Sequence, residues 1–127
     1  MPAPERMFFT RIVATPPALD NAAWPADALV LRVAPDEALV VATVHAAAVP
    51  DPHAIIEPET GLCGMWIDMA AAMPFLEREC DWELPVERPA FAQGAVAGLP
   101  LKLWFTHERV LCVVPAPFAV DFAERWS

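Results

Sequence analysis

The stretch FAQGAVAGLPLKLWFTHERVLCVVPAPFAVDFAERW (Phe91–Trp126) decides the fold, because short apolar segments alternate in it with turn-forming residues before the pattern becomes helical. Short runs rich in apolar residues and bounded by turn residues are typical of strands. Consecutive strands with such short connections pair antiparallel. We expect three of them, at Gln93–Ala97, Leu101–Phe105 and Arg109–Val114, with turns at Gly98-Leu99-Pro100 and Thr106-His107-Glu108.

The end of the stretch predicts a helix that opens after two prolines, Pro115 and Pro117. Proline is favoured in the first turn of a helix, where its missing N–H costs nothing. Large apolar residues then recur at helical spacing. The expected apolar stripe is Phe118, Phe122 and Trp126, or alternatively Val120 and Ala123.

Upstream of this stretch, the clearest prediction is a β-hairpin. Leu29–Val33 and Ala38–Val44 are rich in β-branched and other apolar residues. Between them, Ala34-Pro35-Asp36-Glu37 fits a type I turn, with the proline at the second position and the aspartate at the third. The first 27 residues are rich in proline, which leaves room for one strand, Phe8–Val13, expected at a sheet edge.

The middle of the chain predicts a connector, a strand and a helix. Pro50–Thr60 contains three prolines and is interpreted as a connector with at most a short extended piece, His53–Glu57. Gly61–Ile67 is the next expected strand, after which Asp68 can cap a helix that runs to about Cys80. A start at Met69 would place Pro74 beyond the first turn at the cost of one backbone bond. A start near Met73 costs less and is the expectation.

Together these elements predict the α+β class: an antiparallel-rich sheet of about five to seven strands with two helices packed on one face. The chain of 127 residues has the commonest size of a single domain. We expect one domain over residues 1–127. Within it, residues 1–27 form a Pro-rich segment with one edge strand, and residues 28–127 form a compact body.

Composition and charge exclude some functions and indicate a partner. Hydrophobic residues make up 57% of the chain, above the roughly 45–50% of ordinary domains, so another protein or a second copy is expected to cover apolar surface. Seventeen acidic and eight scattered basic residues argue against nucleic-acid binding. No apolar run is long enough to span a membrane, and the N-terminus does not resemble a signal peptide, so the expected location is the cytoplasm.

Two regions resemble the gamma subunit of heterotetrameric sarcosine oxidase and the wider family of aminomethyltransferase-like, folate-binding domains. The first is the hairpin LVLRVAPDEALVV, and the second is the segment from FLERECDWELPVERP to the final FAVDFAERW. Together they cover roughly Leu29–Trp126. One departure is that Ala92-Gln93-Gly94-Ala95 lacks the threonine that the family usually has after the glutamine.

The resemblance implies a fold similar to one half of a folate-binding protein and an accessory role. In that family the gamma subunit is not the chain that carries flavin, folate or catalysis. The resemblance therefore implies that this chain binds no cofactor alone, and that it packs against a larger oxidoreductase which holds any flavin or folate. A stand-alone protein that binds a folate, pterin or flavin is the alternative.

Candidate binding residues are few. Trp66 and Trp104, each in an expected strand, could form an aromatic floor for a flat ligand, although large aromatics equally fill cores. Arg88 and Gln93, beside the loop before the three strands, are the polar residues best placed to face a pocket or a partner. As ordinary solvated loop residues they would have no such role.

No pattern indicates catalysis or metal binding. Cys63, Cys80 and Cys112 are widely spaced without a C-x-x-C pair, and apolar neighbours favour buried, reduced thiols over a nucleophile. The three histidines, His45, His53 and His107, fall near turns or strand ends. Asp36 and Glu37 form an acidic pair, but the turn explains the aspartate. The sequence therefore predicts no catalytic residue and no metal ligand.

Overall fold

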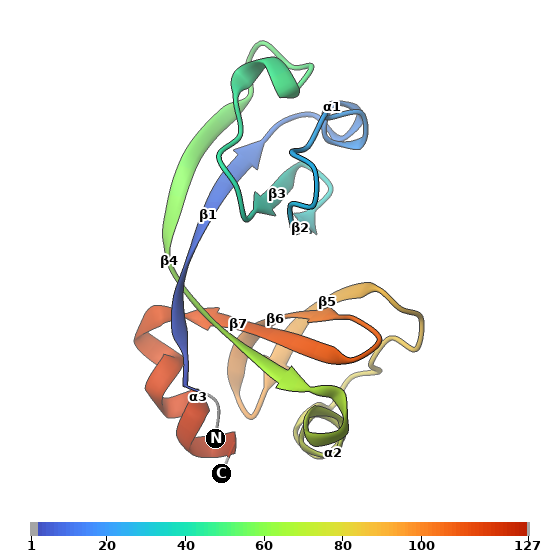
Figure 1. Ribbon diagram of the computed structural model, residues 1–127, viewed down its shortest axis with the longest axis vertical. Helices are drawn as coiled ribbons and strands as arrows, with labels where there is room; N and C mark the ends of the chain where they lie inside the picture. Colours follow the sequence, from blue (N-terminus) through green and yellow to red (C-terminus); the bar gives the residue numbers. More distant parts are fainter. Residues whose placement is uncertain (1–2, 127) are drawn as a thin grey trace. The chain divides into compact units, whose positions relative to one another are not determined.

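The computed structural model describes residues 3–126, which form seven strands and three α-helices (Figure 1). The α+β class is confirmed. All paired strands whose register is defined run antiparallel. The strands are β1 Glu5–Val13, β2 Val30–Ala34, β3 Glu37–Val40, β4 Ile55–Asp68, β5 Ala90–Val96, β6 Leu99–Phe105 and β7 Arg109–Pro115; the α-helices are α1 Pro16–Asp20, α2 Met69–Glu79 and α3 Ala119–Trp126.

The described part of the chain divides into two compact units, residues 7–60 and residues 61–126 with 3–6. We call them the N-terminal and C-terminal units. Strands β1 and β4 each contribute residues to both, and the hydrogen-bonded strand order is β2-β3-β1-β4-β7-β6-β5. The expectation that the whole chain behaves as one domain stays a prediction. The first two residues of the Pro-rich segment lie outside the described residues.

In the N-terminal unit, the predicted hairpin is confirmed as β2 and β3, with a register shift between Arg32 and Ala34. β1 pairs with β3 and has β4 as its other neighbour, so the prediction of an edge strand is wrong. Arg11 on β1 adds side-chain contacts to both neighbouring strands. Its guanidinium contacts Glu37 of β3 at 3.1 Å and Glu57 of β4 at 2.8 Å. The prolines of this segment flank β1 and do not interrupt it.

The predicted connector is also partly wrong, because β4 begins at Ile55 and continues through Pro58. Proline fixes an extended-compatible φ and biases the preceding residue toward extended backbone, so it does not by itself exclude a strand. A second unpredicted element is α1, which begins at Pro16. Thr15 caps it by accepting the Ala18 N–H at 3.3 Å. The core of this unit contains Ile12, Leu19, Ala38, Val40 and Val49.

In the C-terminal unit, β4, β7, β6 and β5 form successive antiparallel pairs, and α2 and α3 pack on one face of them (Figure 1). This confirms the three consecutive strands and the two helices on one face. The shared core includes Ile67, Phe75, Leu103, Cys112 and Phe122. Alternation of side chains along each strand places the residues between these core positions on the other face of the sheet.

Helix α2 begins at Met69 and contains Pro74, so the prediction of a start near Met73 is wrong. Asp68 occupies the N-cap position, but its side chain makes no capping hydrogen bond. The start is fixed by a tertiary contact in which the Met69 N–H donates to the Glu108 carbonyl at 2.8 Å. The single backbone bond lost at the proline is offset by the burial of Phe75 and Leu76 in the core.

The turn between β5 and β6 consists of Ala97 and Gly98, one position earlier than predicted. Both residues have positive φ, 52° and 78°, which is the signature of a type I′ hairpin turn. Leu99 and Pro100, expected in the turn, begin β6 instead. Arg125 of α3 donates a hydrogen bond to the Ala97 carbonyl, so the turn is tied to the last helix.

The last helix buries the expected stripe at Phe122 and Trp126 but not at Phe118. Ala119 and Phe122 are buried and Trp126 packs against the core, whereas Phe118 is 40% exposed. The reason is that residues 116–118 form a short 3₁₀ turn, and the α-helix starts only at Ala119. The change of helical period rotates Phe118 away from the stripe.

Candidate functional site

The candidate site lies on the sheet face of the C-terminal unit that is opposite α2 and α3. Paired residues on neighbouring antiparallel strands point to the same face. Three such pairs form one row across four strands. Trp66 of β4 pairs with Leu111 of β7, Leu111 pairs with Trp104 of β6, and Trp104 pairs with Phe91 of β5. We call these four residues the aromatic row.

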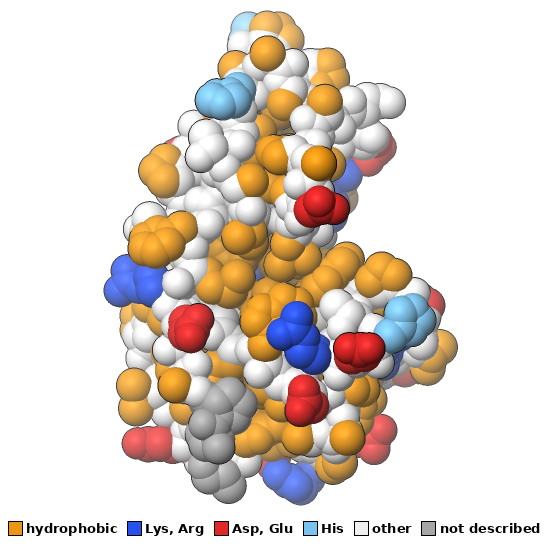
Figure 2. Space-filling model, viewed as in Figure 1, with side chains coloured by type: hydrophobic (Ala, Val, Ile, Leu, Met, Phe, Trp, Pro, Cys, Tyr) orange, Lys and Arg blue, Asp and Glu red, His pale blue; other side chains and the backbone are white. Residues whose placement is uncertain are grey.

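The aromatic row is partly accessible. Trp66 is 39% exposed, Trp104 and Phe91 are half-buried, and Leu111 between the tryptophans is buried. Such pairs in adjacent strands bring side chains into contact range, so the two indoles flank the leucine. In the space-filling view, hydrophobic side chains gather over the β5–β7 region with charged side chains between them (Figure 2).

Two cations and one amide share this face. The Arg109 guanidinium lies 4.2 Å from the centre of the Trp66 ring, within the range of a cation–π contact. Lys102 and Gln93 are paired with each other in the adjacent row of the sheet. The face thus combines flat apolar groups with the charges of Arg109 and Lys102 and with the Asp68 carboxylate opposite Arg109, a set that suits either a protein surface or a planar anionic ligand.

The structure brings together three of the four residues expected at a site. Trp66, Trp104 and Gln93 lie on the same sheet face, which accords with an aromatic floor, whereas Arg88 lies elsewhere. The Arg88 guanidinium is 4.7 Å from the ring centre of Phe105, a core residue on the helix side, and donates to the Pro85 carbonyl. Whether any of the four residues binds a ligand stays a prediction.

Sequence reasoning missed the other members of the face, namely Phe91, Leu111 and Arg109. The period-two alternation in β5 and β7 assigns them to one side of their own strands. Their alignment with the tryptophans depends on strand order and register, which side-chain pattern alone does not fix. A registry shift of one residue would have moved each of them to the opposite face.

A second candidate is a groove beside the C-terminal end of α2, which we call the α2 groove. Met73, Trp82 and Leu84 form its apolar part and pack against the core, while Glu77, Glu83 and Val86 also line it. Its volume is about 490 Å³. Trp82 is fixed there because its indole N–H donates to the Ala95 carbonyl at 2.8 Å. A Cβ at Gly94 would approach the Trp82 ring to 2.8 Å, so only glycine fits beneath it.

The cysteines are all free, but they differ in exposure. Cys112 is completely buried in the core, and burial raises the pKa of its thiol to about 12. Cys63 and Cys80 are half-buried. Burial, followed by the nearby Asp81 and Glu79 carboxylates, raises the pKa of Cys80 as well. A raised pKa disfavours the thiolate, which is the nucleophilic form.

Within residues 3–126, no three His, Cys, Asp or Glu side chains come close enough to hold a metal ion. Over the same residues no polar or charged side chain is classed as buried. None of the described helices is both long and apolar enough to cross a membrane.

Comparison with known proteins identifies the class of fold. No family model matches the sequence, and no curated protein sequence matches it. Among solved structures the fold is shared with a chain of an oligomeric oxidase. That structure is heterotetrameric sarcosine oxidase from Corynebacterium sp. U-96, solved in complex with pyrrole 2-carboxylate. The TM-score is 0.74 at 16% identity, and the match covers 97% of this chain and 79% of the other.

The likeness confirms, at the level of the fold, the resemblance that the hairpin and the final segment indicated. It extends beyond those two regions, since it includes nearly the whole chain. At 16% identity it concerns the fold alone.

Proposed function

We propose that this chain is a non-catalytic accessory subunit that binds a larger protein, and that their complex is a flavin-dependent amine oxidase of the sarcosine oxidase type. The fold likeness to a chain of a heterotetrameric enzyme supports this assignment. The partner, not this chain, would hold flavin or folate. The complex would reside in the cytoplasm.

The observation that carries the proposal is the aromatic row. Protein interfaces are enriched in Trp, Phe and Arg, and a few such residues at the centre dominate the binding energy. Trp66 and Phe91, at the two ends of the row, and Arg109 beside Trp66 supply these residue types on one sheet face. Covering the exposed part of Trp66 with a partner would remove its apolar surface from water, which is favourable.

The test is sedimentation velocity at micromolar concentration, with and without the product of a neighbouring oxidase-like gene. We expect the chain to sediment with that partner. Trp66→Glu should weaken the complex by more than about tenfold, because it places a charge in the apolar centre of the interface. Val120→Glu is the matched control, since Val120 is a 67% exposed apolar residue on α3; it should leave binding unchanged.

Four results would speak against the proposal or a part of it. A chain that stays monomeric with such a partner present would contradict binding. Equal effects of the two variants would contradict the role of the aromatic row. Turnover of a small substrate by the purified chain alone would contradict the non-catalytic role. A dimer of the chain alone that Trp66→Glu dissociates would assign the row to a second copy instead.

A second candidate function is binding of a planar anionic molecule of the folate, pterin or flavin type. The alignment of Trp66 and Trp104 around Leu111, with Arg109 and Lys102 on the same face, favours it. Aromatic faces stack on flat rings, and the cations would attract a carboxylate or phosphate.

Quenching of tryptophan fluorescence by FMN and by folate tests this second function. Saturable quenching that Lys102→Glu weakens, and that Arg78→Glu on α2 leaves unchanged, is the expected result. Linear, unsaturable quenching that is equal in all variants would exclude the site. Because this assay needs no protein partner, its outcome is separate from that of the sedimentation experiment.

A further inference from the structure

We propose that the α2 groove is a docking site for a partner segment in which a large apolar side chain is flanked by lysine or arginine. The inference rests on the accessory-subunit function proposed above and adds a second contact, away from the aromatic row. Its occupant follows from the two chemical parts of the groove, an apolar floor and an acidic rim.

The floor takes one apolar side chain. Met73, Trp82 and Leu84 are only partly buried although they pack against the core, so each keeps a surface facing the groove. A volume of about 490 Å³ is within the roughly 300–1,000 Å³ of small binding sites, which is ample for one aromatic or branched side chain. Val86 at the rim is 86% exposed and extends the apolar surface outward.

The rim sets the charge of the occupant. Five of the residues from 77 to 87 are acidic and one is basic. That base, Arg78, is paired with Glu79 at 3.2 Å. Within residues 3–126 neither Glu77 nor Glu83 forms an ion pair.

The remaining cation of the groove is already engaged. Arg88 donates to the carbonyls of Pro85 and Glu87, both at 2.8 Å, and its guanidinium lies over the Phe105 ring. It holds the loop in shape and does not neutralise the rim carboxylates. Arg88 keeps its positive charge, but five carboxylates against Arg78 and Arg88 still leave residues 77–88 with an excess of negative charge, which attracts basic groups and repels acidic ones.

The groove is held in one shape from both sides. Trp82 is fixed by its hydrogen bond to the Ala95 carbonyl and by its close approach to Gly94. On the helix side, the end of α2 is joined to the β5–β6 turn, because the Ala97 N–H donates to the Glu79 carbonyl at 3.2 Å. A preformed surface avoids much of the ordering cost of binding.

The probe is a short fluorescein-labelled peptide in which one phenylalanine is flanked on each side by two lysines, in a Gly/Ser background. We expect anisotropy to report binding to the full-length chain with a Kd below about 1 mM, weakened by salt. The same peptide with glutamates for lysines, or with alanine for phenylalanine, should not bind. Cys80 lines the groove, so the peptide should slow its labelling by a thiol reagent and leave Cys63 on β4 unaffected.

Variants on the protein locate the site. The double variant Glu77→Lys with Glu83→Lys should weaken binding of the peptide about tenfold. Val86→Asp should weaken binding by a similar factor without changing a core residue. Glu124→Lys, the same substitution at a single exposed position of α3, is the control for each Glu→Lys replacement and should have no effect. Circular dichroism of every variant checks that the fold is intact.

The outcomes separate the two proposals. Absence of binding up to about 1 mM, or equal effects of the groove variants and the control, would overturn the docking site whatever the larger partner does. If the oxidase-like partner binds the chain and the groove variants leave that complex unchanged, the docking site is wrong and the subunit function stands. If the peptide binds as expected but no partner is found by sedimentation, the subunit function fails and the groove remains a docking site.

Discussion

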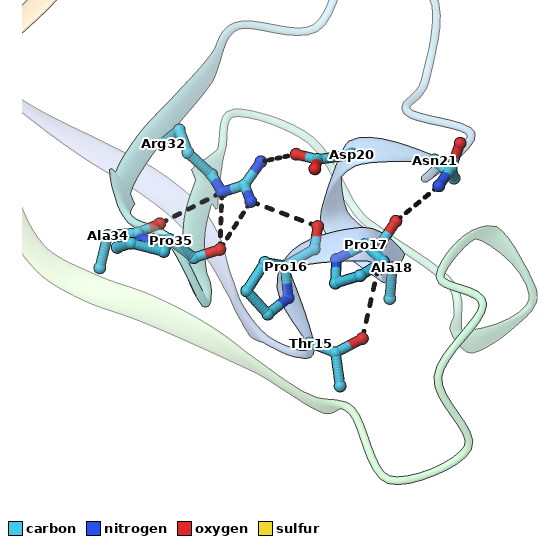
Figure 3. Close-up of polar contacts among 9 residues, drawn as sticks. All are labelled: Thr15, Pro16, Pro17, Ala18, Asp20, Asn21, Arg32, Ala34 and Pro35. Carbon is cyan, nitrogen blue, oxygen red and sulfur yellow. Dashed lines mark hydrogen bonds and ion pairs between the residues drawn. The ribbon is translucent and has the colours of Figure 1, made fainter.

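Arg32 is the residue that fixes the N-terminal unit locally (Figure 3). Its guanidinium donates to the carbonyls of Pro16 and Pro35 and forms an ion pair with Asp20 at 2.8 Å. It thereby joins α1 to the turn between β2 and β3. Around it, Thr15 caps α1, and the Asn21 side chain donates to the Pro17 carbonyl (Figure 3).

Replacing Arg32 tests this organisation. Arg32→Ala should lower the free energy of unfolding by about 1–3 kcal/mol, because it removes several charge-assisted hydrogen bonds to carbonyls. Asp20→Asn removes only the exposed ion pair and should cost about 0.2–1 kcal/mol. Urea denaturation measures both. An equal loss in the two variants would show that the ion pair, and not the carbonyl contacts, dominates.

Asp51 gives the N-terminal unit a pH-dependent contribution. Its carboxylate accepts the N–H of His53 at 2.8 Å and that of Thr15 at 3.0 Å, and these bonds hold its pKa below the ordinary value of 3.8. A pKa lowered by folding means that the stabilisation is present above the unfolded-state pKa. It is lost as the pH falls through the folded-state pKa.

We therefore expect Asp51→Ala to be less stable than the unmodified chain at pH 7, and the difference to shrink as the pH falls below about 4. Urea denaturation from pH 7 to pH 2.5 measures the difference. Glu124→Ala, which removes an exposed carboxylate on α3, should show no comparable trend. A difference in the free energy of unfolding that stays constant over this range would mean that the contribution of Asp51 to stability does not depend on the charge of its carboxylate.

At the scale of elements, α3 depends on Phe122 and not on Phe118. Phe122 is fully buried, with its ring centre 6.0 Å from that of Phe75 on α2 and 6.4 Å from that of Trp126. The ring centres of Phe75 and Trp126 are 4.1 Å apart. These rings join the two helices over the sheet. The adjacent Phe118 sits in the 3₁₀ turn and is 40% exposed.

The two phenylalanines form a matched pair for mutation. Phe122→Ala should cost about 3–5 kcal/mol, since it removes a large buried ring and leaves a cavity. Phe118→Ala makes the same chemical change at a partly exposed site and should cost less than about 1 kcal/mol. Thermal or urea denaturation followed by circular dichroism distinguishes them. Similar losses would mean that Phe118 contributes to the packing of α3 as much as Phe122 does.

At the scale of the whole molecule, we expect the two units to unfold together. Each unit has its own hydrophobic core, yet β1 and β4 supply residues to both. Because β1 and β4 are continuous through both units, unfolding of one unit is expected to weaken the pairing of these two strands in the other. We therefore predict one cooperative unfolding transition, in keeping with the expectation of a single domain.

Leu19→Ala tests this cooperativity, because Leu19 is 2% exposed and belongs to the N-terminal core. The substitution should destabilise that core by about 2–5 kcal/mol. Native-state hydrogen exchange then reports on β7 in the other unit, around Cys112. If unfolding is cooperative, the free energy of opening measured at those amides falls by as much as the global stability does. Unchanged protection would show that the units are independent domains.

The sequence by itself determined the elements whose signal is local. The hairpin around Pro35 and the three strands from Gln93 to Val114 follow from side-chain alternation and turn residues, which act over a few positions. The same kind of signal assigned Trp66 and Trp104 to strands. It could not assign them to a common face with Phe91, because strand order and register depend on pairings between distant residues.

Only the tertiary structure decided the features where a distant contact outweighs a local preference. Helix α2 starts at Met69 despite Pro74, because the Glu108 carbonyl accepts the first N–H of the helix and the core buries Phe75. β1 is interior because both of its edges find partners, with Arg11 joining the neighbouring strands. Local preferences are about 1 kcal/mol for most residues and about 3 kcal/mol for a proline inside a helix, which the burial of two large side chains, Phe75 and Leu76, offsets.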